Sequence, residues 1–576
     1  MPSTFINSVR AIFDAERIEM AAAIPFSACR VTNPEKLAQR GVAESQSVLV
    51  FLVPYYAGAA SMNGSDSAHR PNISNYAAAR DYHVYFKGFF ERVCAKLHET
   101  FPEYRFSGSA DNAPIDERHA AVTAGLGMYG DSGLLINEIY GTYVFIGEIF
   151  SDMPWEQYYD HCTTPFEPQH AVCMHCGACK KHCPMYDNPF GVNRCLSEVT
   201  QTKNLETLAA GSAAFSARDC IDLIRYYGSA WGCDRCQTFC PYNKEARITP
   251  IPFFLEALTP HLTAEQVQTM PDAVFAERAY AWRKKSTIVR NLEILEADAA
   301  AGLPCAAALE DILSAIRNAG AFMRTAHDVE QETGSITEKT GDANFVTVYD
   351  VRVQEMLMKA LQNILPHAQF FAEEKENDPA MLTTGDTFII DPIDGTTNFI
   401  HNYGISAISV GLLHNGIPVF GAVYNPYREK MYEARRGIGA FCNGKKMHVS
   451  SRPPHKGVFA VGTAPYYRSI LGDNTFAVMR RLFDLGADIR RLGSAALDLC
   501  AVASGVADGY VELRISPWDF AAGALLVTEA GGVITDTDGN PLDFKHACPV
   551  GVIAGTPSTH VALLEAVHAA YKKGNI

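Results

Sequence analysis

The sequence lacks any apolar run of the ~20 residues that a membrane-spanning helix needs. Its most apolar early stretch, residues 48–60, is interrupted by Pro54 and is expected to form a buried strand. The first residues also lack the basic and apolar segments of a secretory signal. The sequence therefore predicts a cytoplasmic protein with no membrane partner, in a compartment where clustered cysteines bind metal more often than they form disulfides.

The sequence also has no excess of positively charged residues. The 49 Lys and Arg residues against 64 Asp and Glu residues give a formal net charge of −15. This balance argues against binding nucleic acid or an anionic membrane through bulk electrostatics. The sequence shows no internal repeat, and its 48% hydrophobic and 20% charged residues are typical of globular proteins rather than of disordered, collagen-like or coiled-coil chains.

A stretch of small residues, 299–304, divides the sequence into two large modules. At roughly 150 residues per domain the chain would form two to four units, and the pattern favours two. Both modules alternate helical periodicity with short β-rich runs, which predicts an α/β and α+β multidomain fold. The expected strands are 47–53, 143–149, 387–393, 405–413 and 419–424, and an amphipathic helix is expected over 308–330.

The 16 cysteines are unevenly distributed, and 12 of them precede residue 241. A C-x2-C-x2-C-x3-C-P run begins at Cys173, and a C-x2-C-x3-C-P run begins at Cys233, with Cys195 between them. Eight thiolates are the number that two [4Fe–4S] clusters need, and paired Cys-Pro endings argue against a zinc ribbon. The expected ligands of the first cluster are Cys173, Cys176, Cys179 and Cys240, and those of the second are Cys183, Cys195, Cys233 and Cys236. The other cysteines are expected to be small buried hydrophobes.

Five further motifs precede these cysteines: 73–77, 80–83, 111–118, 124–127 and 141–148. Together with the cysteines they resemble the epoxyqueuosine reductase family, cobalamin and iron–sulfur enzymes of queuosine biosynthesis in tRNA, over about residues 35–295. The resemblance implies that Asp111 is a catalytic proton donor and that the clusters pass electrons to cobalamin. A carboxyl kept protonated by an apolar pocket would suit that role.

The sequence departs from this family between Gly127 and Asp131. Met128 and Asp131 stand where the family's G-W-x-G-K pattern has an aromatic residue and a cation, and the family's helical-repeat region is truncated near residue 290. These departures, with the acidic charge, argue against tRNA as a partner. They leave cobalamin binding open and allow two interpretations: an iron–sulfur oxidoreductase with an unidentified electron donor, or an electron-transfer or redox-sensing unit that regulates the second module.

The second module carries an acidic motif at the end of an apolar strand. Asp391 and Asp394 are separated by Pro392 and an isoleucine, so that two hard oxygen donors converge as Mg²⁺ requires. The N–H groups of residues 395–397 are expected to open a helix toward a phosphate. Glu373 and Glu374 lie upstream, and Asp519 begins an apolar helix, where the helix dipole favours a carboxylate.

These residues are similar to the inositol monophosphatase family of metal-dependent, lithium-sensitive phosphatases, over about residues 307–570. The implied metal ligands are Glu373, Asp391, the carbonyl of Ile393, Asp394 and Asp519. The implied catalytic residues are Asp394 and Thr396, with Thr396 orienting the attacking water. Substrate contacts are implied for Gly395, Thr396, Thr397, Ala495 and Glu512. Lys339 and Asp350 match the segment near the weaker metal site. The family's mechanism uses Mg²⁺ to activate water and to stabilise the leaving group.

Hydroxyl recognition by Glu512 would select an inositol, sugar or other polyol phosphate. The alternative substrates within this class are a nucleotide or fructose bisphosphate, but no Lys- or Arg-rich insertion near the motif indicates a second phosphate site. A homodimer is implied by resemblance only. We therefore predict a reductase-like α/β domain (1–160), a ferredoxin-like double-cluster module (161–250), a helical connector (251–306) and a layered αβαβα phosphatase domain (307–576).

Overall fold

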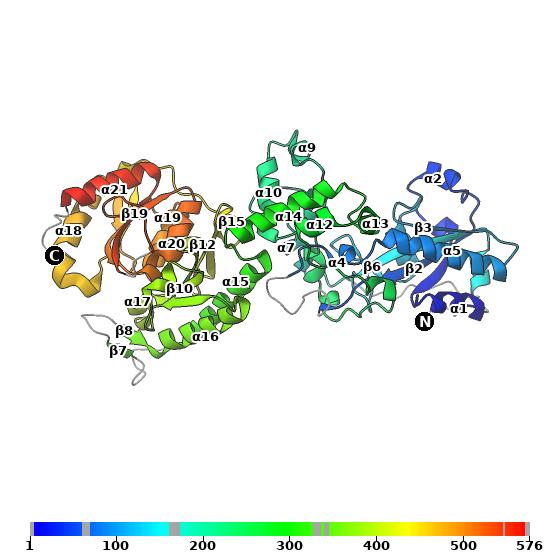
Figure 1. Ribbon diagram of the computed structural model, residues 1–576, viewed down its shortest axis with the longest axis horizontal. Helices are drawn as coiled ribbons and strands as arrows, with labels where there is room; N and C mark the ends of the chain where they lie inside the picture. Colours follow the sequence, from blue (N-terminus) through cyan, green and yellow to red (C-terminus); the bar gives the residue numbers. More distant parts are fainter. Residues whose placement is uncertain are drawn as a thin grey trace. The chain divides into compact units, whose positions relative to one another are not determined.

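The computed structural model describes residues 5–59, 70–160, 173–326, 336–338, 345–544 and 548–570. The chain divides into two compact units (Figure 1). Unit 1 contains residues 1–224 and 228–296, and unit 2 contains residues 225–227 and 297–576. The main division thus falls close to the change of sequence character near residue 300, while the finer four-domain division stays a prediction.

Unit 1 is built on a four-stranded antiparallel sheet with the order β1-β2-β6-β3. The strands are β1 (Ala21–Pro25), β2 (Ser47–Pro54), β6 (Val144–Ser151) and β3 (Phe106–Ala110). Every residue of β2 is buried, which agrees with the uninterrupted apolar run there. One face of the sheet packs against α1 (Asn7–Ala15) and α5 (Tyr82–Thr100), and the other packs against α2 (Pro34–Gln39) and α6 (Glu117–Thr123).

The rest of unit 1 is mainly short helices and loops. A small two-stranded sheet, β4 (Met128–Tyr129) with β5 (Leu135–Ile136), precedes the cysteine region. The helices are α4 (Asn75–Ala78), α7 (Ala178–Lys181), α8 (Leu196–Gln201), α9 (Leu205–Ala209), α10 (Ala217–Tyr227), α11 (Arg235–Thr238), α12 (Ala264–Thr269), α13 (Asp272–Phe275) and α14 (Lys285–Ala300). Buried Trp231 and Tyr280 centre a separate apolar core among these helices.

Unit 2 begins with two helices and a seven-stranded sheet of order β15-β14-β13-β12-β11-β10-β9. The helices are α15 (Ala306–Met323) and α16 (Val348–Ile364). The strands are β9 (Gln369–Ala372), β10 (Asp386–Asp394), β11 (Ala407–His414), β12 (Ile417–Asn425), β13 (Lys430–Arg435), β14 (Gly439–Cys442) and β15 (Lys445–Lys446). All neighbours pair antiparallel except β9 and β10, which are parallel. The short strands β7 (Ile336–Glu338) and β8 (Phe345–Thr347) pair antiparallel in a separate sheet.

A second sheet of unit 2 has the order β17-β16-β18-β20-β19. Its strands are β16 (Val458–Val461), β17 (Asp488–Arg490), β18 (Gly509–Ile515), β19 (Val533–Asp536) and β20 (Val550–Gly555). Helices α19 (Ala495–Ala503) and α20 (Pro517–Glu529) contribute to the core between the two sheets, while α18 (Arg468–Leu485) and α21 (Pro557–Ala570) cover the outer face of the second sheet. With α15 and α16 outside the first sheet, the layers are αβαβα, which confirms the predicted architecture.

The strands expected from the sequence are all present, as β2, β6, β10, β11 and β12. The expected helix over 308–330 corresponds to α15, which ends at Met323; residues 327–330 lie outside the described part of the chain. None of the described helices combines the length and the apolar character that crossing a membrane would demand. The two-cluster module predicted for residues 161–250 stays a prediction, and residues 161–172 lie outside the described ranges.

Candidate functional site

Three carboxylates of unit 2 meet where β10 ends and α20 begins. Ligand atoms of Asp391, Asp394 and Asp519 all lie within 4.8 Å of one another. Asp391 pairs with Ser409 of β11 and Asp394 pairs with Ala407, so β10 has one residue more than its partner over this interval. This β-bulge contains Pro392, which has no N–H to donate to a sheet, and it redirects both aspartates at the strand end.

The close packing of α20 on the first sheet brings Asp519 to the same point. A Cβ at Gly421 would lie 2.8 Å from the carbonyl oxygen of Ala522, so only glycine fits there. Asp519 stands in the first turn of α20, where its carboxylate accepts a 2.7 Å hydrogen bond from the backbone N–H of Ser516 in a capping box. The cap and the helix dipole both favour a carboxylate at this position.

These carboxyl groups repel one another. Burial raises the pKa of Asp391 well above its ordinary value, and the charges of Glu373, Asp394 and Asp519 raise it further. Burial also raises the pKa of Asp394, to about 6, although hydrogen bonds from Ser494 and Ala496 oppose the shift. Several buried carboxyls without a cation among them are unfavourable, and the oxygen donors are the type that Mg²⁺ prefers. The donor set therefore fits a hard divalent cation.

Glu373 follows β9 and lies beside this group. Its backbone N–H donates a 3.1 Å hydrogen bond to the carbonyl of Ile390, which extends the parallel pairing of β9 with β10. Glu373 lines a cavity of about 560 Å³ together with Asp391, Asp394 and Asp519. The expected contacts Ile393, Gly395, Thr396, Thr397, Ala495 and Glu512 also line this cavity. The structure thus brings the expected metal ligands and substrate contacts together in one cavity.

Thr396 opens the short helix α17 (Thr396–Ile400) behind Gly395. Gly395 has a φ of +87°, and a Cβ there would lie 3.0 Å from the carbonyl oxygen of Gly493, so the turn requires glycine. The Thr396 hydroxyl lies 3.1 Å from the carbonyl oxygen of Ile393 and 3.4 Å from the carboxylate of Asp350. Burial raises the pKa of Asp350 to about 7. Lys339, expected near Asp350, lies outside the described residues.

Glu512 lines the same cavity from β18. It is buried, and it accepts hydrogen bonds from the Tyr510 hydroxyl and from the backbone N–H of Ala464, the latter at 2.8 Å. Burial raises its pKa. The carboxyl is therefore held in one orientation, with the geometry of a fixed hydrogen-bond acceptor.

Several cavity residues were missed by the sequence reasoning. They are Tyr466, Tyr467, Arg491, Asp498 and Arg514. Arg514 follows Glu512 by two residues on the same strand, so the period of two along a strand could have indicated that both face one side. Asp498 follows the N-cap Ser494 by four residues on α19, a spacing that places both on one face of a helix.

The eight predicted cluster cysteines form two groups in unit 1. Cys173, Cys176, Cys179 and Cys240 line one small cavity. Burial raises the pKa of the Cys240 thiol, the N–H of Tyr242 opposes this by hydrogen bonding, and the other three thiols raise it further. These are the four cysteines that the sequence assigned to one cluster.

The second group consists of the other four predicted ligands. Burial raises the pKa of Cys236 to about 12, and the charges of Cys183 and Cys195 add to this. Burial raises the pKa of Cys233 as well, with further contributions from Cys195 and Cys236. Cys179 also acts electrostatically on both Cys183 and Cys236, so the two groups lie close to each other.

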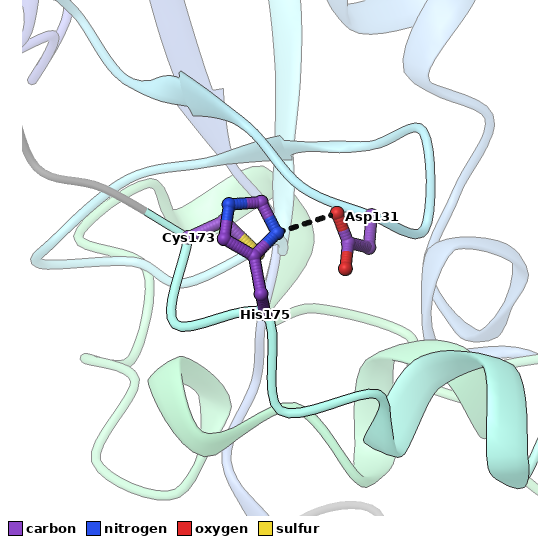
Figure 2. A group of neighbouring side chains, drawn as sticks. All are labelled: Asp131, Cys173 and His175. Carbon is purple, nitrogen blue, oxygen red and sulfur yellow. Dashed lines mark hydrogen bonds and ion pairs between the residues drawn. The ribbon is translucent and has the colours of Figure 1, made fainter.

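Asp131, one of the departures from the reductase pattern, contacts the cysteine loop. Figure 2 shows its carboxylate facing the imidazole of His175, with Oδ1 2.9 Å from Nδ1, and Cys173 beside the pair. The three residues offer ligand atoms within 4.8 Å of one another. Because Cys173 belongs to the first group of cysteines, the Asp131–His175 pair holds that loop against the segment after β4.

Asp111 lies at the end of β3 in a left-handed conformation, with a φ of +49°. The Tyr82 hydroxyl donates a 2.8 Å hydrogen bond to its carboxylate, and His83 Nε2 lies 3.4 Å away. The hydrogen bond from His83 lowers the pKa of Asp111, and the side chain is half exposed. The expectation of a carboxyl kept protonated in an apolar pocket is therefore wrong for Asp111 itself, because two donors at the start of α5 stabilise its charged form.

Burial raises the pKa of two other carboxyls that interact with Asp111, namely Glu148 and Glu117. Glu148 on β6 is fully buried, neither of its oxygens has a hydrogen-bond partner, and burial raises its pKa well above the ordinary value. Burial raises the pKa of Glu117 on α6 to about 7, and Asp111 raises it further. The carboxyls of this region whose pKa is raised are thus Glu148 and Glu117 rather than Asp111.

Comparison with known families finds two matches along the chain. Residues 307–572 match the model of the inositol monophosphatase family. Residues 35–111 match the model described as "Epoxyqueuosine reductase QueG, DUF1730". The predicted union of these two families in one chain is confirmed by the matches.

Individual relatives match the second half of the chain. Inositol monophosphatase 1 of Sus scrofa is 39% identical over 237 residues, which are 40% of this chain and 83% of the relative. Inositol monophosphatase 2 of Rattus norvegicus is 36% identical over 253 residues, which are 43% of this chain and 86% of the relative. The crystal structure of extragenic suppressor protein suhB from Bartonella henselae is 32% identical and covers 46% of this chain and 99% of that chain, with a TM-score of 0.42.

Proposed function

Through residues 307–572 the chain belongs to the inositol monophosphatase family, and we propose that unit 2 is a Mg²⁺-dependent phosphatase acting on a phosphate monoester of an inositol, a sugar or another polyol. The observation that carries the proposal is the convergence of Asp391, Asp394 and Asp519 at one side of a polar cavity. The cavity is large enough for a sugar phosphate and has a buried acceptor, Glu512, for substrate hydroxyls.

The proposed Mg²⁺ ligands are the three aspartates, Glu373 and the carbonyl of Ile393. A carbonyl oxygen has two lone pairs, so the hydrogen bond from Thr396 leaves the Ile393 oxygen able to coordinate a cation. When bound, Mg²⁺ would neutralise the charge of the phosphate and make a nearby water easier to deprotonate. Binding of the cation would also relieve the mutual repulsion that raises the pKa values of the aspartates.

The protein's own groups then orient the reactants. The Thr396 hydroxyl, which contacts Asp350, would hold the attacking water. Gly395, Thr396 and Thr397 line the cavity, and their backbone N–H groups would bind the phosphate. Glu512, fixed by Tyr510 and Ala464, would accept a hydrogen bond from a substrate hydroxyl. This division of roles favours a phosphorylated polyol over an aromatic phosphate.

The test is Asp394→Asn in the full chain. The substitution keeps the side-chain shape but removes a charged oxygen, so phosphate release from an inositol or sugar phosphate at saturating Mg²⁺ should fall by about 10²–10³-fold. Asp473→Asn, an exposed residue of α18, is the matched control and should keep full activity. Normal turnover by Asp394→Asn would reject the assigned site.

For unit 1 we propose two [4Fe–4S] clusters in an oxidoreductase module resembling epoxyqueuosine reductase. The supporting observation is the grouping of the eight cysteines into two neighbouring sets of four. Such clusters would supply one-electron transfer, and N–H donors such as that of Tyr242 near Cys240 would tune it. Iron and acid-labile sulfide analysis of anaerobically purified protein should give eight irons per chain.

A second candidate function for unit 1 is electron transfer or redox sensing that regulates the phosphatase, without a substrate of its own. It is favoured by Asp131, which stands where the reductase family has a cation and pairs instead with His175. Retention of cobalamin during anaerobic purification would support the reductase. Absence of bound cobalamin, together with a change of phosphatase rate on cluster reduction, would support the regulatory unit.

A further inference from the structure

The phosphatase cavity is lined by cationic as well as acidic side chains. The side chains of Arg491 and Arg514 line it, and both are remote in sequence from the Asp391–Asp394 motif. Neither guanidinium forms an ion pair within the described part of the chain, where Arg452, Arg480 and Arg324 of the same unit each pair with a carboxylate at 2.9–3.1 Å. The cavity thus contains two cationic groups that no carboxylate of the described residues binds in an ion pair, although the charge of Arg491 acts on buried Glu512 and Asp498.

Arg514 is held in place without its hydrogen-bonding capacity being used. Its guanidinium carbon lies 4.4 Å from the centre of the Tyr467 ring, a cation–π contact that fixes the plane of the group. Its Nε is buried and has no hydrogen-bond partner. A buried N–H without an acceptor is unfavourable. The Arg514 Nε–H is therefore available to donate a hydrogen bond to a ligand.

Arg491 reaches the cavity from the loop before α19. Two of its nitrogens lie 3.0 and 3.3 Å from the Thr463 hydroxyl oxygen, and a third lies close against Gly493. A guanidinium has five donors, so these contacts leave donors for a ligand. Thr463 therefore orients Arg491 without neutralising it.

The two arginines and the aspartates give the cavity both cationic and acidic groups. The aspartates would bind the scissile phosphate through Mg²⁺, and buried Glu512 and Asp498, which line the same cavity, favour neutral hydroxyls over anions. An anionic group is therefore favoured only at the arginines, where the planar guanidinium matches phosphate and carboxylate oxygens in a bidentate manner.

We propose that the substrate is a phosphate monoester carrying a second anionic group, a phosphate or a carboxylate, and that Arg491 and Arg514 bind that group. This inference rests on the proposed phosphatase function and narrows its substrate class. The sequence did not indicate such an anion site, because no Lys- or Arg-rich insertion adjoins the acidic motif.

The experiment compares two matched substrate pairs on the full chain with Mg²⁺. One pair is fructose 1-phosphate and fructose 1,6-bisphosphate, and the other is glycerol 3-phosphate and 3-phosphoglycerate. In one pair or both, we expect kcat/KM to be at least about tenfold higher for the substrate that carries the second anionic group. A desolvated, charge-assisted hydrogen-bonded pair is worth roughly that factor. A preference in either pair supports the proposal, and the preferred pair identifies the second group as phosphate or carboxylate.

The variants Arg514→Gln and Arg491→Gln should bring this ratio of kcat/KM values close to one, mainly through KM. Arg491 is exposed, so its variant tests the proposal even where Arg514→Gln fails to fold. Arg480→Gln, whose parent side chain pairs with Asp484 on α18, is the control and should keep the wild-type ratio.

Two outcomes overturn the inference, and they are distinguishable. Equal kcat/KM within both pairs for the wild-type protein, or a ratio unchanged in both arginine variants, would reject the anion site while the phosphatase function stands. Absence of Mg²⁺-dependent hydrolysis of all four substrates and of inositol 1-phosphate would reject the proposed function and the inference with it.

Discussion

The backbone N–H of Ala496 donates a 2.9 Å hydrogen bond to the carboxylate of Asp394, across about a hundred residues of sequence. The Ser494 hydroxyl donates to the same carboxylate, and Ser494 is also the N-cap of α19. The start of one helix thus stabilises the charged form of a carboxyl that burial would otherwise protonate. The site depends on this donor pair as much as on the acidic residues themselves.

Ser494→Ala should weaken the response to Mg²⁺. Loss of a hydrogen bond to a charged group costs about 1.5–3 kcal/mol, and loss of an N-cap costs about 1 kcal/mol. The pKa of Asp394 should therefore rise, and the Mg²⁺ concentration for half-maximal phosphatase activity should increase by about tenfold, more at pH 6 than at pH 8. Ser504→Ala, at the other end of α19, is the control; an equal Mg²⁺ response in the two variants would contradict the role of Ser494.

Gly462→Ala should displace Glu512. A Cβ at residue 462 would lie 1.9 Å from a carboxylate oxygen of Glu512, so the acceptor would have to leave its position beside Ala464. We expect KM for a polyol phosphate to rise by about tenfold, the value of one hydrogen bond to a charged group. Gly472→Ala is the matched control, because a Cβ there meets nothing within 4 Å and alanine stabilises a helix by about 1 kcal/mol. An unchanged KM for Gly462→Ala would show that Glu512 does not contact the substrate.

Cys176→Ser should reduce the iron content from eight toward four per chain. Serine is a poor ligand for a cluster, while the second group of four cysteines is left intact. Cys305→Ser changes an exposed cysteine that belongs to neither group and should leave the iron content unchanged. Eight irons in purified Cys176→Ser, measured with protein quantified by amino-acid analysis, would remove Cys176 from the ligand set.

Glu148→Met should stabilise unit 1 at alkaline pH. In the unfolded chain Glu148 ionises near its ordinary pKa of 4.5, whereas burial keeps it protonated in the folded state to much higher pH. Above pH 4.5 the unfolded state therefore binds fewer protons than the folded state, and the free energy of unfolding falls as pH rises.

Replacing Glu148 with methionine removes both this dependence and an unpartnered buried polar group worth about 1–3 kcal/mol. Thermal unfolding at pH 5 and pH 8 should show a gain in midpoint that is larger at pH 8. A loss of stability at both values would indicate that Glu148 has a stabilising partner in solution.

The layered fold and the acidic site of unit 2 were predictable because their signals are local. The alternation that defines β10, the bulge-forming Pro392 and the capping position of Asp519 all lie within a few residues of the groups that they place. The assignment of the eight cysteines to two clusters came from the ferredoxin-like motif spacing, and it stays a prediction.

The features that were missed depend on contacts between distant segments. Arg491 and Arg514 line one cavity although they come from the loop before α19 and from β18, and no local sequence pattern encodes that these two segments meet. The apolar surroundings of Asp111 were predicted wrongly for the same reason: Tyr82 and His83 at the start of α5 reach it across nearly thirty residues and lower its pKa. The buried, unpartnered carboxyl is instead Glu148 on the neighbouring strand.

Gly421, which packs against α20, affects how the sequences of related proteins should be interpreted. An alanine at residue 421 would preserve every acidic side chain of the site, yet its methyl group would collide with the backbone of Ala522 and push the helix that carries Asp519 off the sheet. Catalytic activity is thus expected to require glycine at residue 421 as well as the acidic residues. A survey that sorts homologous genes into active and inactive copies by their acidic motif alone would count such a copy as active.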